Sequence, residues 1–229
     1  MAAKAQPAPR SQGVRAKRLS LFATPLAVSL LPETEDLKPA LSALILACYQ
    51  EDAPSEDAQL ATGLAWRGSF SRASTGVAQL APLSEAAIVL AETMQAESGQ
   101  AESGRAESDG AWDVSWRAEV LNPGQGFDVQ CLKGGLWCAS YLVDDGGAAA
   151  SGGELELQDP RGAAPVMYAP GLTFAAPGGE TLGISQTVRP KEGALIVFPA
   201  WLLQSTALHQ GSDARLSLSL LLRPQSPQR

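Results

Sequence analysis

A change in the spacing of apolar residues near residue 111 limits the possible folds of this chain more than any other feature. Before that point, apolar residues recur every three or four positions, as they do in amphipathic helices. From residue 112 onward they alternate with polar residues or form short continuous runs, which is typical of strands with one or both faces buried. Turn clusters rich in Gly, Pro, Asn and Asp separate these runs. The sequence therefore predicts a mainly β domain of the sandwich or jelly-roll class, with flanking helices.

Two segments predict helices that pack on the outside of one sheet. Residues 35–50 place apolar side chains at helical spacing on one face, and residues 82–94 do the same after Pro82, which suits a first helical turn. Trp137 and Trp201 are expected to line the core. The expected strands are 19–31, 112–120, 136–143, 153–158, 182–188, 194–199 and 215–222.

The length of 229 residues suits a single domain. We expect a disordered basic tail at 1–18, an N-terminal strand with the flanking helices at 19–94, a β core at 111–224 and a short tail at 225–229. Residues 95–110 form a tandem repeat of AESG-type units with no apolar residue larger than Ala, which predicts an exposed loop between helices and core.

Charge and composition argue against several classes of function. The net charge of −7 disfavours a nucleic-acid partner, and no apolar run is long enough to span a membrane. One histidine and three cysteines without a CxxC pair argue against a zinc site and favour a reducing compartment. The basic tail lacks the apolar segment of a secretory signal, so it is either a disordered tail or an organelle transit peptide. We therefore expect an intracellular protein, cytoplasmic or organellar.

The segment FPAWLLQSTALHQGSDARLSLSL, residues 198–220, joins an apolar strand through a turn to a strand that begins with Arg215. Strand alternation places Arg215, Ser217 and Ser219 on one face and leucines on the other. This pattern predicts a polar face inside the sandwich, with the leucines packed toward the helices. The single histidine, His209, lies in the turn, where we expect it to be exposed to solvent.

Several segments together resemble the superfamily of 2-oxoglutarate- and iron(II)-dependent oxygenases, in particular an uncharacterised bacterial and algal branch. The resemblance covers residues 19–224, its C-terminal part is the most specific, and it implies a double-stranded β-helix, a cupin-like jelly roll. The segments are LFATPL (21–26), LAWRGS (64–69), QCLKGGLWCASYLV (130–143), LQDPRG (157–162), GALIVFPAWLLQ (193–204) and RLSLSL (215–220).

Set on these motifs, the metal-ligand positions of the family carry Gln130, Leu132 and Gln204 in this chain. The resemblance also implies three residues that bind the cosubstrate. Arg215 and Ser217 would bind the distal carboxylate of 2-oxoglutarate, and Tyr141 would lie in the same pocket. Non-haem iron is held by two imidazoles and a carboxylate, whereas a Gln amide is a weak neutral ligand and Leu offers none. We therefore expect vacated metal positions, no Fe(II), no catalytic residue, and 2-oxoglutarate as the candidate ligand.

The leading hypothesis is a non-catalytic binding or structural module that retains a small-carboxylate site. Its expected partners are such an acid or a protein, and neither a nucleic acid nor a membrane. One alternative is an active 2-oxoglutarate/Fe(II) dioxygenase whose ligands lie at other positions than this alignment gives, or whose metal site is rebuilt from Asp128, Cys131 and His209, with Asp128 on the same strand face as Gln130. Another is a cupin-like isomerase or lyase that works without iron, although no acid/base pair in the sequence supports it.

Overall fold

The computed structural model describes residues 24–31, 34–52, 65–70, 77–97, 112–147, 152–162, 167–168, 174–176, 179–181 and 184–225. The expected tail at 1–18 lies outside the described residues, as do all but Gln225 of the expected tail at 225–229 and residues 98–111, which hold most of the expected exposed loop.

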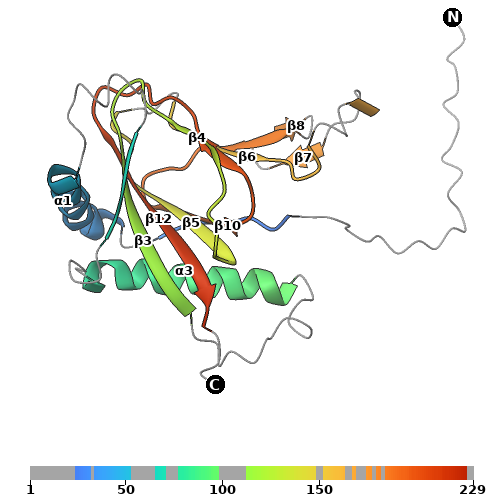
Figure 1. Cartoon of the computed structure of the whole chain (residues 1–229), viewed down its shortest axis with the longest axis horizontal. Coiled ribbons are helices and arrows are strands. Elements are labelled where there is room, and N and C mark those ends of the chain that lie inside the picture. Colours follow the sequence, from blue (N-terminus) through green and yellow to red (C-terminus); the bar gives the residue numbers. More distant parts are fainter. Residues whose placement is uncertain are drawn as a thin grey trace, which may run out of the picture.

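Ten of the described strands form two antiparallel sheets, and two more form a short hairpin (Figure 1). The smaller sheet and the hairpin lie on the side of the larger sheet that is away from helix α3. The larger sheet has the order β1 (Ala27–Leu30), β10 (Ala194–Pro199), β5 (Trp137–Asp144), β12 (Arg215–Pro224), β3 (Trp112–Leu121) and β2 (Trp66–Ser69). The smaller sheet has the order β4 (Phe127–Gln130), β11 (Gln204–Thr206), β6 (Leu155–Gln158) and β9 (Ser185–Val188), and the hairpin pairs β7 (Phe174–Ala176) with β8 (Gly179–Thr181).

Two helices, α1 (Thr34–Asp52) and α3 (Val77–Glu97), pack their apolar side chains against the outer face of the larger sheet. α3 begins at Val77, so Pro82 lies inside the helix and not in its first turn as predicted. Proline has no N–H to donate, so the helix loses one backbone hydrogen bond there. No helix in the described part of the chain is long and apolar enough to cross a lipid bilayer.

Strand β12 separates two apolar cores. Leu216, Leu218, Leu220 and Leu222 lie in the core between the larger sheet and the helices, whereas Leu221 lies in the core between the two sheets. The polar residues that alternate with these leucines therefore face the smaller sheet, as the sequence pattern predicts. The predicted jelly-roll arrangement of a mainly β domain with flanking helices is confirmed.

The sequence prediction also contains errors. The strands β2, β4 and β11 were not expected, because each has only three or four residues and shows too little alternation to be recognised. Trp201 was expected in the core but is 54% exposed, because it lies in the turn that follows β10. Trp137, in contrast, is a buried core residue.

Candidate functional site

Two of the three expected metal-ligand positions are neighbours between the sheets. Gln130 at the end of β4 is the cross-strand partner of Gln204 at the start of β11. Leu132 follows β4, is 6% exposed and belongs to the apolar core between the sheets. These side chains supply two neutral amides and one aliphatic group. This donor set does not fit Fe(II), which non-haem oxygenases hold with imidazoles and a carboxylate.

A β-bulge in β4 decides which of its side chains face this interior. Gln130 pairs with Gln204 and Phe127 pairs with Thr206, so β4 contains one residue more than β11 between the two pairs. Asp128 is exposed, which corrects the expectation that it shares a strand face with Gln130. A metal site rebuilt around Asp128 would therefore lack an inward-facing carboxylate.

The space beside Gln130 holds the guanidinium group of Arg67, from β2, which the sequence analysis did not identify as a site residue. Arg67 Nη1 donates to Gln130 Oε1 at 2.7 Å. Its Nε donates to Glu119 Oε1 at 2.7 Å, and its Nη2 forms an ion pair with the same oxygen at 2.7 Å. The guanidinium carbon also lies 4.1 Å from the centre of the Phe127 ring. A cation that belongs to the protein is thus held next to the expected metal site.

Little free space remains around this ion pair. The cavity there measures about 20 Å³, which is room for about one water molecule, and 2-oxoglutarate does not fit. Cys138 also lines the cavity, and its Sγ accepts a hydrogen bond from Gln204 Nε2 at 3.9 Å. Burial, with a contribution from the charge of Glu119, raises the pKa of the Cys138 thiol to about 12. The thiol therefore stays protonated at neutral pH and is not available as a thiolate ligand.

Arg215, the expected carboxylate-binding residue, is 5% exposed. Its Nη1 donates to Ser217 Oγ at 3.2 Å, and that hydroxyl donates to Glu119 Oε2 at 3.2 Å. Burial lowers the pKa of Arg215, while the charges of Glu119 and Asp145 raise it. Within the described residues no carboxylate forms an ion pair with Arg215. The guanidinium groups of Arg67 and Arg215 thus lie on either side of the Glu119 carboxylate, which is bonded directly to Arg67 and through Ser217 to Arg215.

A cleft of about 400 Å³ opens at Arg215. Arg189, which is ion-paired with Glu154, and Lys191 also line it, as do the acidic residues Asp145 and Glu192. Gly153 lies against Arg215: its φ is +71°, and a Cβ there would meet Arg215 Cδ at 2.8 Å. Glycine is therefore required for the backbone to pass so close to the arginine. The volume is sufficient for a small organic acid.

Tyr141 does not join these residues. It is 1% exposed and is the cross-strand partner of Leu218 and Leu195, in the core beneath the helices. Because side chains alternate along β5, Tyr141 faces away from Ser217. The expectation that it lies in the cosubstrate pocket is therefore corrected.

His209 is fully buried, which corrects the expectation of a solvent-exposed turn residue. Its exposed fraction is 0%, and its Nε2 lies 2.7 Å from the carbonyl oxygen of Asp213. Backbone hydrogen bonds connect it to Gly124 and Gln125 in a neighbouring turn. His209 therefore ties two turns together. It does not share a potential metal site with Asp128 in the described part of the chain.

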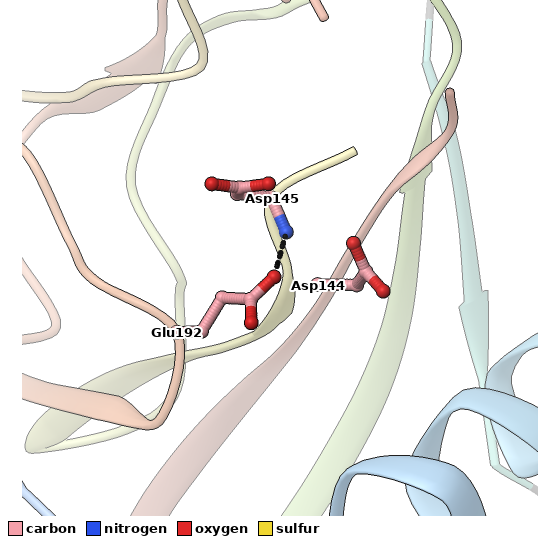
Figure 2. A group of neighbouring side chains, drawn as sticks. All are labelled: Asp144, Asp145 and Glu192. Atoms are coloured by element: carbon pink, nitrogen blue, oxygen red, sulfur yellow. Dashed lines mark hydrogen bonds between the residues drawn. The ribbon is translucent and has the colours of Figure 1, made fainter. Parts of the chain in front are cut away.

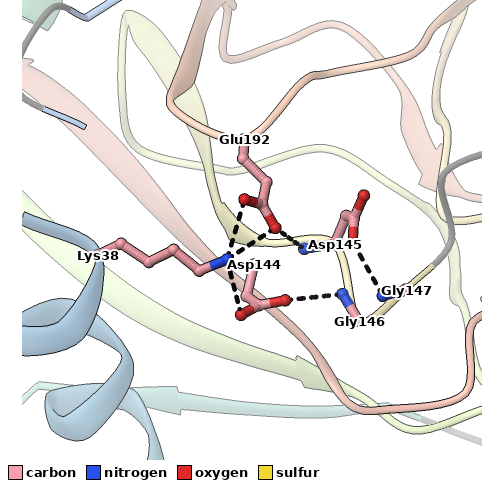
Figure 3. Close-up of polar contacts among 6 residues, drawn as sticks. All are labelled: Lys38, Asp144, Asp145, Gly146, Gly147 and Glu192. Atoms are coloured by element: carbon pink, nitrogen blue, oxygen red, sulfur yellow. Dashed lines mark hydrogen bonds and ion pairs between the residues drawn. The ribbon is translucent and has the colours of Figure 1, made fainter. Parts of the chain in front are cut away.

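A different group of carboxylates could hold a metal ion within the described residues. Asp144 and Asp145 at the end of β5 and Glu192 before β10 place one oxygen each within 4.8 Å of one another (Figure 2). Lys38 from α1 points into this group, with Nζ 3.0 Å from Asp144 Oδ2 and 2.9 Å from Glu192 Oε2 (Figure 3). The hydrogen bond to Glu192 is the main cause that raises the pKa of Lys38. A metal ion would have to displace this ammonium group.

Comparisons with known proteins agree on the fold. No family model and no curated protein matches the chain. A prolyl-4-hydroxylase from Pseudomonas putida is similar over 87% of this chain and 93% of its own, with a TM-score of 0.55 and 16% identity. The non-haem α-ketoglutarate-dependent carbocyclase SnoK from nogalamycin biosynthesis is similar over 89% of this chain and 84% of its own, with a TM-score of 0.54 and 13% identity. The chain therefore has the fold of 2-oxoglutarate/Fe(II) oxygenases, as its motifs predict.

Proposed function

We propose that this protein is an oxygenase-like binding module that has lost its metal centre and retains a small-carboxylate site at Arg215. The observation that carries the proposal is an arginine that is 5% exposed and whose hydrogen bond within the described residues goes to a neutral hydroxyl, that of Ser217. A buried charge without a counter-ion is unfavourable. A ligand carboxylate would relieve this by accepting two parallel hydrogen bonds from the guanidinium group.

The proposed loss of the metal centre follows from the groups around Gln130 and Gln204. Neither amide competes with imidazole for iron, and Leu132 has no donor atom. Arg67 adds a positive charge that would repel a divalent cation in a partly buried site. The ion pair of Arg67 with Glu119 also stands in the hydrogen-bonded chain that leads from Gln130 to Arg215. A ligand bound at Arg215 is therefore separated from the metal positions.

The ligand that we propose is a short dicarboxylate, with 2-oxoglutarate as the first candidate. Lys191 lines the same cleft as Arg215 and supports the binding of a second carboxylate; of the acids in the cleft, Glu192 is already paired with Lys38. The structurally similar enzyme SnoK is α-ketoglutarate dependent. This likeness makes the same acid the natural first ligand to test.

Isothermal titration of 2-oxoglutarate and succinate tests the carboxylate site. We expect wild type to bind, and Arg215→Gln to lose at least about tenfold in affinity because a charge-assisted pair is removed. Arg161→Gln is the matched control, since Arg161 lies in an exposed turn, paired with Asp159. Unchanged affinity in Arg215→Gln, or no binding by folded wild type, would contradict the site.

A second candidate function is an active dioxygenase that binds its metal at Asp144, Asp145 and Glu192. The convergence of these carboxylates is the observation that favours it. Anaerobic iron titration and oxygen consumption with 2-oxoglutarate decide between the candidates. The binding-module proposal expects no turnover. Oxygen consumption that is abolished in Glu192→Gln would support the dioxygenase and overturn the proposal.

A further inference from the structure

A second cleft, of about 350 Å³, lies where β3 continues past the end of β2. Its walls come from β2, β3, β12 and the first turn of α3, and none of its residues lines the cleft at Arg215. The lining residues are Ser69, Phe70, Leu80, Asp113, Val114, Ser115, Trp116, Arg117 and Arg223. The cleft is thus a separate site with a polar and an apolar part.

The polar part carries an excess of positive charge. Arg117 makes no hydrogen bond or ion pair within the described residues, and its cross-strand neighbours are Ser69 and Ser219. Arg223 Nε donates to the carbonyl oxygen of Gly134 at 3.0 Å, and its Nη1 donates to Ser115 Oγ at 3.2 Å. Its contact with the exposed Asp113 is long, at 3.5 Å. Two guanidinium groups therefore face the cleft against one loosely paired carboxylate.

The apolar part lies around the edge of β3 from these cations, because Trp116 is the cross-strand partner of Leu220 and faces the helices, whereas Arg117 pairs with Ser219 and faces the smaller sheet. Leu80 is buried, and Phe70 and Trp116 are partly buried. Trp116 is fixed in place because its Nε1 donates to Ser84 Oγ on α3 at 3.1 Å. The walls are therefore ordered apolar surfaces, and the volume is within the range of small-molecule sites.

We infer that this cleft binds a small amphipathic acid, with the carboxylate at Arg117 and Arg223 and the apolar body against Phe70, Leu80 and Trp116. An arginine without a partner supplies the parallel donors that a carboxylate prefers. The adjacent apolar surface contributes in proportion to the area removed from water. Neither the cationic part nor the apolar part would be selective alone. Together they favour an acid that carries a hydrocarbon or aromatic body. This site is independent of the carboxylate site proposed at Arg215.

Titration with octanoate, butyrate and octanol on the full-length protein tests the inference without any substitution. We expect octanoate to bind about tenfold or more tightly than butyrate, because of its additional methylene groups. Octanol should also bind at least about tenfold more weakly than octanoate, because it lacks the charge. Nuclear magnetic resonance of nitrogen-labelled tryptophan should show a shift of the Trp116 indole signal, which Trp116→Phe identifies by its loss. Equal binding of the three compounds, or no shift of that signal, would overturn the site.

Variants then separate the two clefts. Arg117→Gln should weaken octanoate binding at least about tenfold and leave 2-oxoglutarate binding unchanged, whereas Arg215→Gln should do the reverse. Arg161→Gln again controls for the loss of one surface charge. If Arg117→Gln does not fold, Arg223→Gln takes its place, with the same expected result. Octanoate affinity that is lost in Arg215→Gln but kept in Arg117→Gln would refute this site while leaving the proposed function intact.

Discussion

Glu119 is the residue on which the polar interior depends. Its side chain is 8% exposed and receives hydrogen bonds from Arg67 on one side and from Ser217 on the other. Through Ser217 it also faces Arg215, so Glu119 is hydrogen-bonded toward both guanidinium groups, while Asp145 adds a further negative charge near Arg215. The uncompensated positive charge lies on the side of Arg215, where the larger cleft opens. This imbalance is the physical reason for which we propose an anion site there, in a cleft that Asp145 and Glu192 also line.

The contact of Gly153 with Arg215 leads to a prediction with a matched control. Gly162 has a φ of +65° but no atom within 4 Å of an added Cβ, so Gly162→Ala should cost about 1 kcal/mol from backbone strain alone. Gly153→Ala adds a collision with the arginine at 2.8 Å. We expect a larger loss of about 2 kcal/mol or more in urea unfolding, and weaker 2-oxoglutarate binding. Equal losses in the two variants would show that the arginine moves aside freely.

The buried thiol of Cys138 predicts a dependence of stability on pH. Its pKa is about 12 in the folded state, against 9.0 for a cysteine thiol in the unfolded chain. Between these values the unfolded chain carries a thiolate and the folded chain a thiol, so the folded state binds more protons and loses stability as pH rises. From pH 8.5 to 10.5, wild type should lose about 2 kcal/mol relative to Cys138→Ala in urea unfolding. A constant difference between the two proteins over this range would contradict the prediction.

The short strands β2, β4 and β11 together surround the positions to which the resemblance assigns metal ligands. β2 supplies Arg67, the bulged β4 supplies Gln130, and β11 supplies Gln204. A bulge changes the face of the residues beyond it, so the position of Gln130 depends on the pairing of β4 with β11. The chemistry of the site is therefore a property of how these strands meet.

Removing Arg67 should leave Glu119 buried without the ion pair that it forms within the described residues. We expect Arg67→Met to lose about 3 kcal/mol or more in unfolding free energy, because the remaining carboxylate stays desolvated. Adding Glu119→Gln in the same chain should recover at least half of the loss, since the amide is neutral. If the double variant is as unstable as the sum of the single ones, the two residues do not act as a pair.

The iron affinity gained by placing metal ligands at positions 130, 132 and 204 should depend on Arg67. The variant with Gln130→His, Leu132→Asp and Gln204→His should bind Fe(II) weakly, because the guanidinium group remains beside it. Adding Arg67→Met and Glu119→Gln should raise the affinity at least about tenfold, as measured by anaerobic titration. The same background with alanine at the three ligand positions is the control. Equal iron binding with and without Arg67 would show that the cation does not oppose the metal.

The whole molecule is arranged in layers that separate polar from apolar burial. The helices α1 and α3 and the outer face of the larger sheet enclose a core that is almost entirely apolar. The space between the two sheets contains both an apolar core and the Arg67–Glu119 group. Stability therefore rests mainly on the helix side, whereas the layer between the sheets combines a smaller apolar core with buried polar groups and a cavity of only about 20 Å³.

A truncation in the helix-side core tests this division. Leu218 is 0% exposed, so Leu218→Ala should cost about 2–5 kcal/mol in urea unfolding. Leu208 is 60% exposed, and Leu208→Ala should change stability by less than about 0.5 kcal/mol. We expect 2-oxoglutarate binding to persist in both proteins while they are folded. Similar losses in the two variants would contradict the assignment of the main core.

Local patterns were sufficient to predict the elements with long periodic runs. The strand predicted at 194–199 coincides with β10, and the strand that begins at Arg215 presents the expected alternation of serines and leucines. These predictions succeed because a buried strand must repeat its apolar residues with the period of the pleat, which any short window of sequence reveals. The absence of histidine and carboxylate at 130, 132 and 204 was likewise visible without coordinates.

Contacts between distant segments could not be predicted in this way. Arg67 donates hydrogen bonds to Glu119 and Gln130, which are 52 and 63 residues away in the chain. Its four-residue strand has no sequence pattern from which these partners could be predicted. The bulge that exposes Asp128 arises from pairing with β11, and the burial of His209 arises from the packing of two turns. Sequence periodicity reports which face of a segment is apolar. The partner that a polar side chain meets depends on which segments the folded chain brings together, and that information is absent from any single stretch of sequence.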